Sequence, residues 1–318
     1  MSDTLASVGE AAALARIFPR LPAASAQLLG PGDDAAVIAA PDGRYVVTTD
    51  MMIHGPDFRL AWSTPHDLGW KAAASNLSDV AAMGAVPTAL VVALAAPADS
   101  PVSLLDGIAD GLRDACEALA PGCGVVGGDL SVSPTLTIAV TAFGDLEGRA
   151  PVLRSGARPG NIVAVAGELG AAASALRLLF ERAQTDGVPD AALADELRPG
   201  TAAQLAPRPP ITAGREASLA GATAMLDLSD GLAIDAGRLA TASGIRIDFD
   251  STLLGDDPAL ALGGGEDHSL LATFPPGDLP AAFRRIGVCE PGEGISVDGE
   301  PHDRAGWDPY REWSGEAG

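Results

Sequence analysis

The chain has 318 residues, enough for two domains that each bury a core of their own. Hydrophobic residues make up 47%, charged residues 19% and aromatic residues only 4%, which predicts a globular protein whose core is filled mainly by Ala, Val and Leu. Its 42 acidic and 20 basic residues give a formal charge of −22, which repels a phosphate backbone and argues against nucleic acid as a partner.

Cysteine usage and the hydrophobic pattern predict the cellular compartment of the protein. The three cysteines, Cys116, Cys123 and Cys289, are odd in number and lack the spacing of zinc sites or redox motifs. The N-terminal segment has no basic start followed by a signal-like apolar core, and the longest apolar stretch, around residues 89–96, is far too short to span a bilayer. We therefore expect a cytoplasmic protein with no membrane partner.

The chain contains a single lysine, Lys71, and no glycine-rich loop precedes it. A Walker A motif is therefore absent, and the companion signatures of a protein kinase are absent too. The acidic charge also disfavours a polyanion such as ATP unless cations intervene. Any ATP chemistry in this chain must neutralise phosphate with metal ions and arginine.

The first half predicts a mixture of strands and helices. Residues 44–53 form a β-rich run in which Val46, Thr48 and Asp50 share one face by strand alternation. A helical pattern follows over residues 67–83, and Asp79 lies near its C-terminal end. The helix dipole opposes a carboxylate at that end, so a cation partner is expected there.

Further elements of this half are a strand at 88–94, a helix at 102–119, a strand running into Gly127–Gly128–Asp129 and a strand at 135–143. This alternation predicts a two-layer α+β domain.

A segment rich in Pro, Gly and Arg follows Gly148 and is typical of a connection between domains. We therefore predict an N-terminal domain at 1–148 and a C-terminal domain at 149–318. The second half repeats the alternation and reads as an α/β sandwich. Its predicted elements are a strand at 162–166, a helix at 171–182, an acidic, Pro-rich excursion to about 210, a strand at 223–228, a helix at 232–242, and strands near 245–249 and 269–274.

Carboxylates stand beside glycine in four segments: residues 32–34, 127–129, 227–231 and 263–267. Glycine lets the backbone approach a ligand closely, and Asp supplies the hard oxygen atoms that magnesium prefers. Any one segment read alone is a turn, and Ser229 and Asp230 are also placed to cap the following helix. Their recurrence, however, indicates a nucleotide–magnesium site.

Two further interpretations concern basic side chains. Arg154 and Arg158 in the linker are either solvated charges or, in a lysine-poor chain, candidates for a phosphate clamp. The four histidines lack metal-ligand spacing, and we assign none of them a catalytic role.

Seven motifs in order give the chain a resemblance to the thiamine-monophosphate kinases, a family in the superfamily of aminoimidazole ribonucleotide synthetase. They are GDDAAV (32–37), TTDMMIHGPDF (48–58), DLGWKAAASNLSDVAAMGAVP (67–87), GGD (127–129), RSGARPG (154–160), LDLSDGL (226–232) and GGGED (263–267). The chain departs from the family at Asp57, where a histidine is frequent, and at His268, where a tyrosine follows GGED.

The resemblance implies an α/β (α+β) fold of two domains, with N-terminal strands that form a barrel across a homodimer and active sites along that interface. Implied magnesium ligands are Asp34, Thr48, Thr49, Asp50, Asp79, Asp129, Asp227 and Asp230. Implied ATP contacts are Gly128, Asp129, Arg154 and Ser229, and implied contacts to thiamine monophosphate are Asp57, Glu266 and Trp307. We expect Asp129, Asp227 and Arg154 to carry catalysis.

The expected reaction is in-line transfer of the ATP γ-phosphoryl group to thiamine monophosphate, the last step of thiamine diphosphate synthesis. An acceptor phosphate is already ionised near neutral pH, so positioning and charge neutralisation suffice. Two alternatives stay open at this point: another ATP-using enzyme of the superfamily that activates an amide or carbamoyl group, and a nucleotide sensor without turnover.

Overall fold

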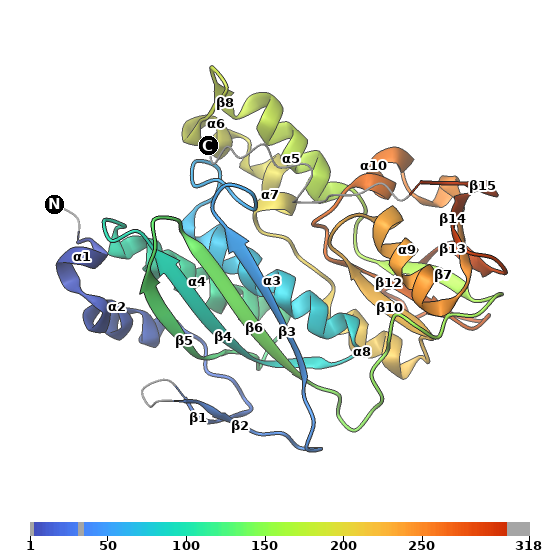
Figure 1. Ribbon diagram of the computed structural model, residues 1–318, viewed down its shortest axis with the longest axis horizontal. Coiled ribbons are helices and arrows are strands. Elements are labelled where there is room, and N and C mark those ends of the chain that lie inside the picture. The colour runs from blue at the N-terminus through green and yellow to red at the C-terminus, as the bar shows by residue number, and fades with distance from the viewer. Residues whose placement is uncertain (1–2, 31–34, 304–318) are drawn as a thin grey trace.

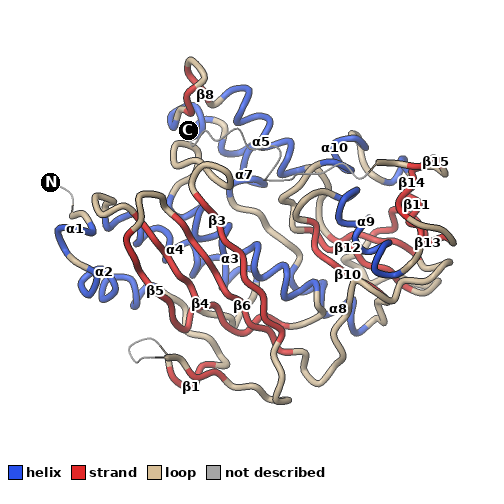
Figure 2. The backbone as a smooth tube through the Cα atoms, in the orientation of Figure 1, coloured by secondary structure: helices blue, strands red, loops and turns tan. Residues whose placement is uncertain are grey.

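The structure is a computed structural model that describes residues 3–30 and 35–303 (Figure 1). Asp34 and Trp307, which the resemblance assigned to magnesium and substrate, lie outside the described residues. Figure 2 shows two main sheets, one built from each half of the chain.

The first half folds into a four-stranded sheet in the order β3-β6-β4-β5, with two long helices on one face (Figure 1). These elements are β3 (Val46–Ile53), β4 (Val86–Ala96), β5 (Val125–Val132), β6 (Thr137–Asp145), α3 (Pro65–Ala82) and α4 (Val102–Leu119). The β4 and β5 strands are parallel because α4 crosses between them, and the other pairs are antiparallel. The predicted two-layer α+β arrangement is confirmed.

The helix α3 lies between the two halves of the molecule. Thr64 caps it through a reciprocal pair with Asp67, and Pro65 occupies its first turn, so the helix begins two residues before the predicted start. One side packs on the four-stranded sheet, and another contacts β10 (Ala224–Leu228) and α8 (Ile211–Leu219). Because both halves cover it, nearly every side chain of α3 is buried, including the polar Asn76 and Ser78.

The sheet face that points away from α3 is open. Val47 and Met51 of β3 are 60% and 58% exposed there, which is high for large apolar side chains. Within the described residues this sheet ends at β3 and β5 and does not close into a barrel. A small hairpin of β1 (Gln27–Leu29) and β2 (Val37–Ile38) lies near one end of it.

The second half forms a seven-stranded sheet in the order β10-β12-β7-β13-β11-β14-β15. The helix α9 packs on one face, and the other face contributes to the core around α3. The strands besides β10 are β7 (Ile162–Ala166), β11 (Arg246–Phe249), β12 (Ser269–Phe274), β13 (Arg284–Glu290), β14 (Gly294–Val297) and β15 (Glu300–Pro301). The helices of this half besides α8 are α5 (Ala171–Arg182), α6 (Ala191–Glu196), α7 (Arg198–Leu205), α9 (Leu232–Ser243), η2 (Ser251–Leu253) and α10 (Pro258–Gly263).

Two regions are more ordered than their sequence predicts. The Pro-rich excursion before residue 210 contains a hairpin, β8 (Gln184–Thr185) with β9 (Val188–Pro189), as well as α6 and α7. The N-terminal segment forms α1 (Leu5–Val8), α2 (Glu10–Ile17) and η1 (Phe18–Arg20). Ion pairs hold it on α4, among them Arg20 Nη1 to Asp110 Oδ2 at 2.6 Å.

No helix in residues 3–30 and 35–303 is long and apolar enough to cross a bilayer.

Candidate active site

A cleft of about 1060 Å³ opens between the two halves. We call it the acidic cleft, since carboxylates from both halves line it. Its charged and polar lining residues include Asp50, Asp57, Lys71, Asp79, Arg154, Asp227, Ser229, Asp230, Glu266 and His268. Most of the site residues that sequence reasoning singled out therefore meet here.

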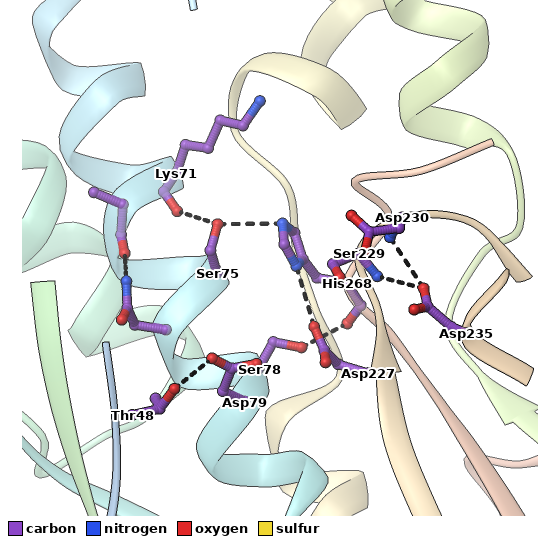
Figure 3. Close-up of polar contacts among 12 residues, drawn as sticks. Thr48, Lys71, Ser75, Ser78, Asp79, Asp227, Ser229, Asp230, Asp235 and His268 are labelled. Atoms are coloured by element: carbon purple, nitrogen blue, oxygen red, sulfur yellow. Dashed lines mark hydrogen bonds and ion pairs between the residues drawn. The ribbon is translucent and has the colours of Figure 1, made fainter. Parts of the chain in front are cut away.

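Four of these aspartates come from three different elements and face one another. Asp50 lies on β3, Asp79 on the last turn of α3, and Asp227 on β10, with Asp230 in the turn that follows β10. Figure 3 shows Asp79 and Asp227 pointing into the same space, with the Thr48 hydroxyl donating to Asp79 Oδ2 over 2.7 Å. Burial, followed by the charges of Asp227 and Asp50, raises the pKa of Asp79 to about 7.

This mutual repulsion is the observation that fits a metal ion. A hard dication such as Mg²⁺ binds oxygen ligands and completes its shell with water and substrate phosphate rather than with a cage of side chains. Within the described ranges, no three carboxylate, His or Cys side chains close around one point. The carboxylate oxygens of Asp50, Asp79, Asp227 and Asp230 are of the chemical type that such an ion prefers.

The Asp79 pKa predicts how stability depends on pH in metal-free protein. A carboxylate whose pKa lies near 7 when folded and at 3.8 when unfolded keeps its proton longer in the folded state, so stability falls as pH rises between those values. Asp79→Asn should flatten this loss and raise the melting temperature at pH 8 by about 2–4 °C for each kcal/mol of repulsion relieved. Thermal melts in EDTA from pH 5 to 8 measure it.

The matched control is Asp186→Asn, at an exposed turn between β8 and β9. It should leave the dependence of melting temperature on pH the same as in wild type. If Asp79→Asn also showed the wild-type dependence of melting temperature on pH, repulsion at Asp79 would be contradicted.

The turn that carries Ser229 and Asp230 is held by a residue that sequence reasoning missed. Asp235 Oδ2 accepts hydrogen bonds from the backbone N–H groups of Ser229 and Asp230 at 3.1 and 3.0 Å. The Arg238 guanidinium forms ion pairs with the carboxylates of Asp230 and Asp235. The helix α9 begins after Gly231, which makes no side-chain cap, so the alternative of a simple Ser229 or Asp230 cap is wrong. An Asp one turn into a helix after an Asp-rich strand end is a signal that could have found Asp235.

The other end of the cleft holds the residues implied for the substrate. Asp57 Oδ2 accepts the Ile53 N–H at 2.7 Å. The backbone of Glu266 adopts the left-handed conformation, with φ of 65°. Its carboxylate forms an ion pair with Lys71 Nζ at 2.7 Å through one oxygen and accepts a hydrogen bond from the Gln204 amide through the other. Burial alone would raise the pKa of Glu266, but Lys71 and Gln204 outweigh it and lower that pKa. The solitary lysine, which sequence reasoning used only to exclude a P-loop, thus lies in the site.

An aromatic wall lines the cleft beside these carboxylates, and sequence reasoning did not predict it. Trp62 and Phe180 meet edge to face with centroids 4.9 Å apart, and the Arg59 guanidinium lies 4.8 Å from the Trp62 ring. Phe58 lines the same region. Only the fold brings residues 58–62 and 180 together. Such a wall suits a flat aromatic ligand.

Asp129, Gly128 and Thr49 lie elsewhere. In the strand register Asp50 aligns with Val140, Val92 and Gly128 across the sheet, so three strand spacings, about 14 Å, separate Asp50 from Gly128. By alternation Thr49 and Asp129 belong to the open face, whereas Thr48 and Asp50 face α3. A single chain therefore does not bring Asp129 to the other aspartates.

Gly128 and Asp129 instead line a second, mostly apolar cavity of about 600 Å³ at the β5 edge, which we call the apolar cavity. Its walls include Ile17 and Phe18 from the N-terminal helices and Val92 from β4.

Gly128 allows close contact between β4 and β5. A Cβ on Gly128 would lie 2.0 Å from the Val92 carbonyl oxygen, whereas one on the neighbouring Gly127 would meet nothing within 4 Å. Gly128→Ala should therefore push the strands apart and lower stability by about 1–3 kcal/mol, and Gly127→Ala should not. Thermal melting of the two variants tests this, and equal melting temperatures would contradict the close contact.

The fold and the acidic cleft together define an enzyme of the AIR synthase related class. The AIR synthase related protein N-terminal domain matches residues 32–146. The curated "Thiamine-monophosphate kinase" of Mycobacterium tuberculosis is 44% identical over 328 residues, which cover 98% of this chain and 94% of that protein. The chain belongs to the thiamine-monophosphate kinase family.

Solved structures agree with this assignment. A thiamine-monophosphate kinase from Stenotrophomonas maltophilia K279a superposes with a TM-score of 0.77 at 33% identity, covering 91% of this chain and 97% of that one. A structure described as AaThiL complexed with AMPPCP and TMP gives a TM-score of 0.74 at 34% identity, covering 86% and 90%.

Proposed function

We propose that the chain transfers the γ-phosphoryl group of ATP to the phosphate of thiamine monophosphate, giving thiamine diphosphate and ADP. The observation that carries this proposal is the convergence of Asp50, Asp79, Asp227 and Asp230 in one cleft, within a chain 44% identical to a thiamine-monophosphate kinase. The relative described with AMPPCP and TMP supports the same two ligand types.

The carboxylates of the acidic cleft would hold magnesium. When bound, the ion neutralises phosphate oxygens and the charge that develops on the transferring group. The chain itself fixes these carboxylates: Thr48 orients Asp79, and Asp235 holds the turn of Ser229 and Asp230. Arg154, which is exposed on the linker and lines the cleft, would hold a phosphate.

The far end of the cleft would take the organic part of thiamine monophosphate. The thiazolium ring is cationic and both rings are flat, so the carboxylates of Asp57 and Glu266 and the aromatic side chains of Trp62 and Phe180 suit it. The acceptor phosphate then points toward the aspartates, and no covalent enzyme intermediate is required.

We further propose that the protein is a homodimer whose open sheet faces form a shared barrel. The exposed Val47 and Met51 support this, because large apolar side chains gain from being covered. A second copy would also bring Thr49, Gly128 and Asp129 within reach of another chain's acidic cleft.

The three cysteines are free and buried, which supports a reducing cytoplasm.

One assay tests the reaction. Purified protein is incubated with ATP, magnesium and thiamine monophosphate, and thiamine diphosphate is measured by fluorescent thiochrome detection after chromatography. We expect product that is stoichiometric with ADP and absent in EDTA. ATP binding without product would favour the nucleotide sensor.

A further inference from the structure

His268 is buried where the glycine-rich loop of residues 263–267 meets α3. Its side chain lies between Ser75 of α3 and Asp227 of β10 (Figure 3). Nε2 lies 3.2 Å from the Ser75 hydroxyl, and Nδ1 lies 3.5 Å from Asp227 Oδ2. His268 thus bridges the two halves of the molecule beside the four aspartates.

The backbone of His268 is also fixed from both halves. Its N–H donates to the Leu228 carbonyl at 2.9 Å, and its carbonyl accepts from the Ser78 hydroxyl at 3.0 Å. The residue adopts φ of 51°, an unusual value for a non-glycine residue. Such a backbone persists only where the surroundings over-determine it, so the position of the ring is imposed by the fold.

The ring orientation follows from its neighbours. The Ser75 hydroxyl donates to the Lys71 carbonyl at 3.0 Å, which leaves its oxygen lone pairs for Nε2. Nε2 therefore lies at hydrogen-bond distance from an oxygen, whereas Nδ1 faces Asp227 Oδ2 at an ion-pair distance of 3.5 Å without a hydrogen bond. A ring flip would replace these contacts by carbon atoms, so the imidazole is held in one orientation.

Asp227 depends on this ring. Its side chain is 7% exposed, and among the residues that the structure describes only His268 makes polar contact with its carboxylate. A buried carboxylate with one partner and three like-charged neighbours would otherwise turn away from them. Asp227 lines the acidic cleft, and Oδ2 is the oxygen that the His268 ring approaches.

We infer that His268 is a positioning residue: it holds Asp227 so that one carboxylate oxygen faces the metal-binding region of the acidic cleft. This rests on the proposed function, because Asp227 is there a magnesium ligand. Groups that orient metal ligands typically contribute 10–100-fold in affinity. His268 contacts neither substrate nor metal in this scheme and acts only through Asp227.

Two amide variants separate the two ring contacts. The amide nitrogen of Asn falls near the Nδ1 position and that of Gln near Nε2. His268→Asn can therefore still donate to Asp227, whereas His268→Gln keeps only the Ser75 contact. We expect His268→Gln to weaken metal binding roughly 10–100-fold and His268→Asn to remain within about 3-fold of wild type.

The readout is binding of Mn²⁺ in the presence of a non-hydrolysable ATP analogue, followed by electron paramagnetic resonance. Turnover is measured in parallel, and kcat should fall with metal affinity in His268→Gln while the KM for thiamine monophosphate stays unchanged. His66→Gln is the matched control, because His66 pairs with Asp114 on the surface and should change nothing. Thermal melting checks that each variant is folded.

Loss of Mn²⁺ affinity in both amide variants, or in neither, would overturn the positioning role. Should His268→Gln fail to fold, Ser75→Ala replaces it, since it frees the ring and should weaken Mn²⁺ binding by about 3–10-fold; unchanged binding would then overturn the inference. A wild-type protein that binds no Mn²⁺ and forms no product would instead sink the proposed function, and this inference with it.

Discussion

Asp227→Asn is expected to lower kcat by about 10²–10³-fold, because it removes one full negative charge from the group of carboxylates that would hold magnesium. Metal ions contribute several kcal/mol to charge stabilisation in such transfers, and each 1.36 kcal/mol is tenfold in rate. The fold should be kept, since Asn has the size of Asp and the substitution relieves repulsion with Asp50 and Asp79. Steady-state kinetics at saturating ATP and thiamine monophosphate measure the effect.

The matched control is Asp248→Asn, in β11 of the same sheet but away from the cleft, where the side chain bonds Ser296 and the Gly299 N–H. It should retain turnover even where it costs stability. Excess magnesium should recover part of the Asp227→Asn activity, because weakened metal binding is one component of the loss. Wild-type turnover in Asp227→Asn would remove it from the site.

Mixed dimers give the second large effect. Asp129→Asn should inactivate the protein as Asp227→Asn does, yet about 14 Å of sheet separates Gly128 from Asp50 in one chain. If a site combines Asp129 of one copy with Asp227 of the other, a hybrid of the two inactive variants contains one intact site. Random mixing makes half the dimers hybrid, so about a quarter of wild-type activity should return.

The experiment unfolds and refolds the two variants together, or co-expresses them with different tags, and compares the mixture with each variant alone. Single-variant samples treated identically are the controls. A mixture as inactive as its components would place Asp129 and Asp227 in the site of the same chain, which requires ATP to span the sheet. A monomeric wild type by sedimentation would exclude the shared site outright.

Much of the fold followed from local pattern. The helices at 102–119 and 171–182 and the strand at 162–166 have the predicted limits, because apolar periodicity and turn residues act within a few positions of each other. The N-terminal helices and the helices α6 and α7 were missed. They are short and are stabilised by distant partners such as the Arg198–Asp67 pair, which no local pattern contains.

The site divides in the same way. Asp227 and Asp230 were identifiable because they stand beside glycine at the end of a strand, and Asp79 because the helix dipole opposes a carboxylate near the C-terminal end of a helix. Asp50 followed from the strand pattern and from the family resemblance. Lys71, Trp62, Phe180 and His268 were not identifiable, because each looks like an ordinary helical or loop residue until the fold supplies its partner.

The sequence by itself determined the family, the main strands and helices around the site, the lack of a P-loop and the acidic character of the site, since these depend on residue type and on spacing along the chain. Only the tertiary structure decided which side chains meet. It set Asp57 and Glu266 beside an aromatic wall, placed His268 against Asp227, and separated Asp129 from the other aspartates by the width of a sheet. Such juxtapositions arise from packing α3 between two sheets, and contacts between residues far apart in the chain are fixed by that packing rather than by any local preference.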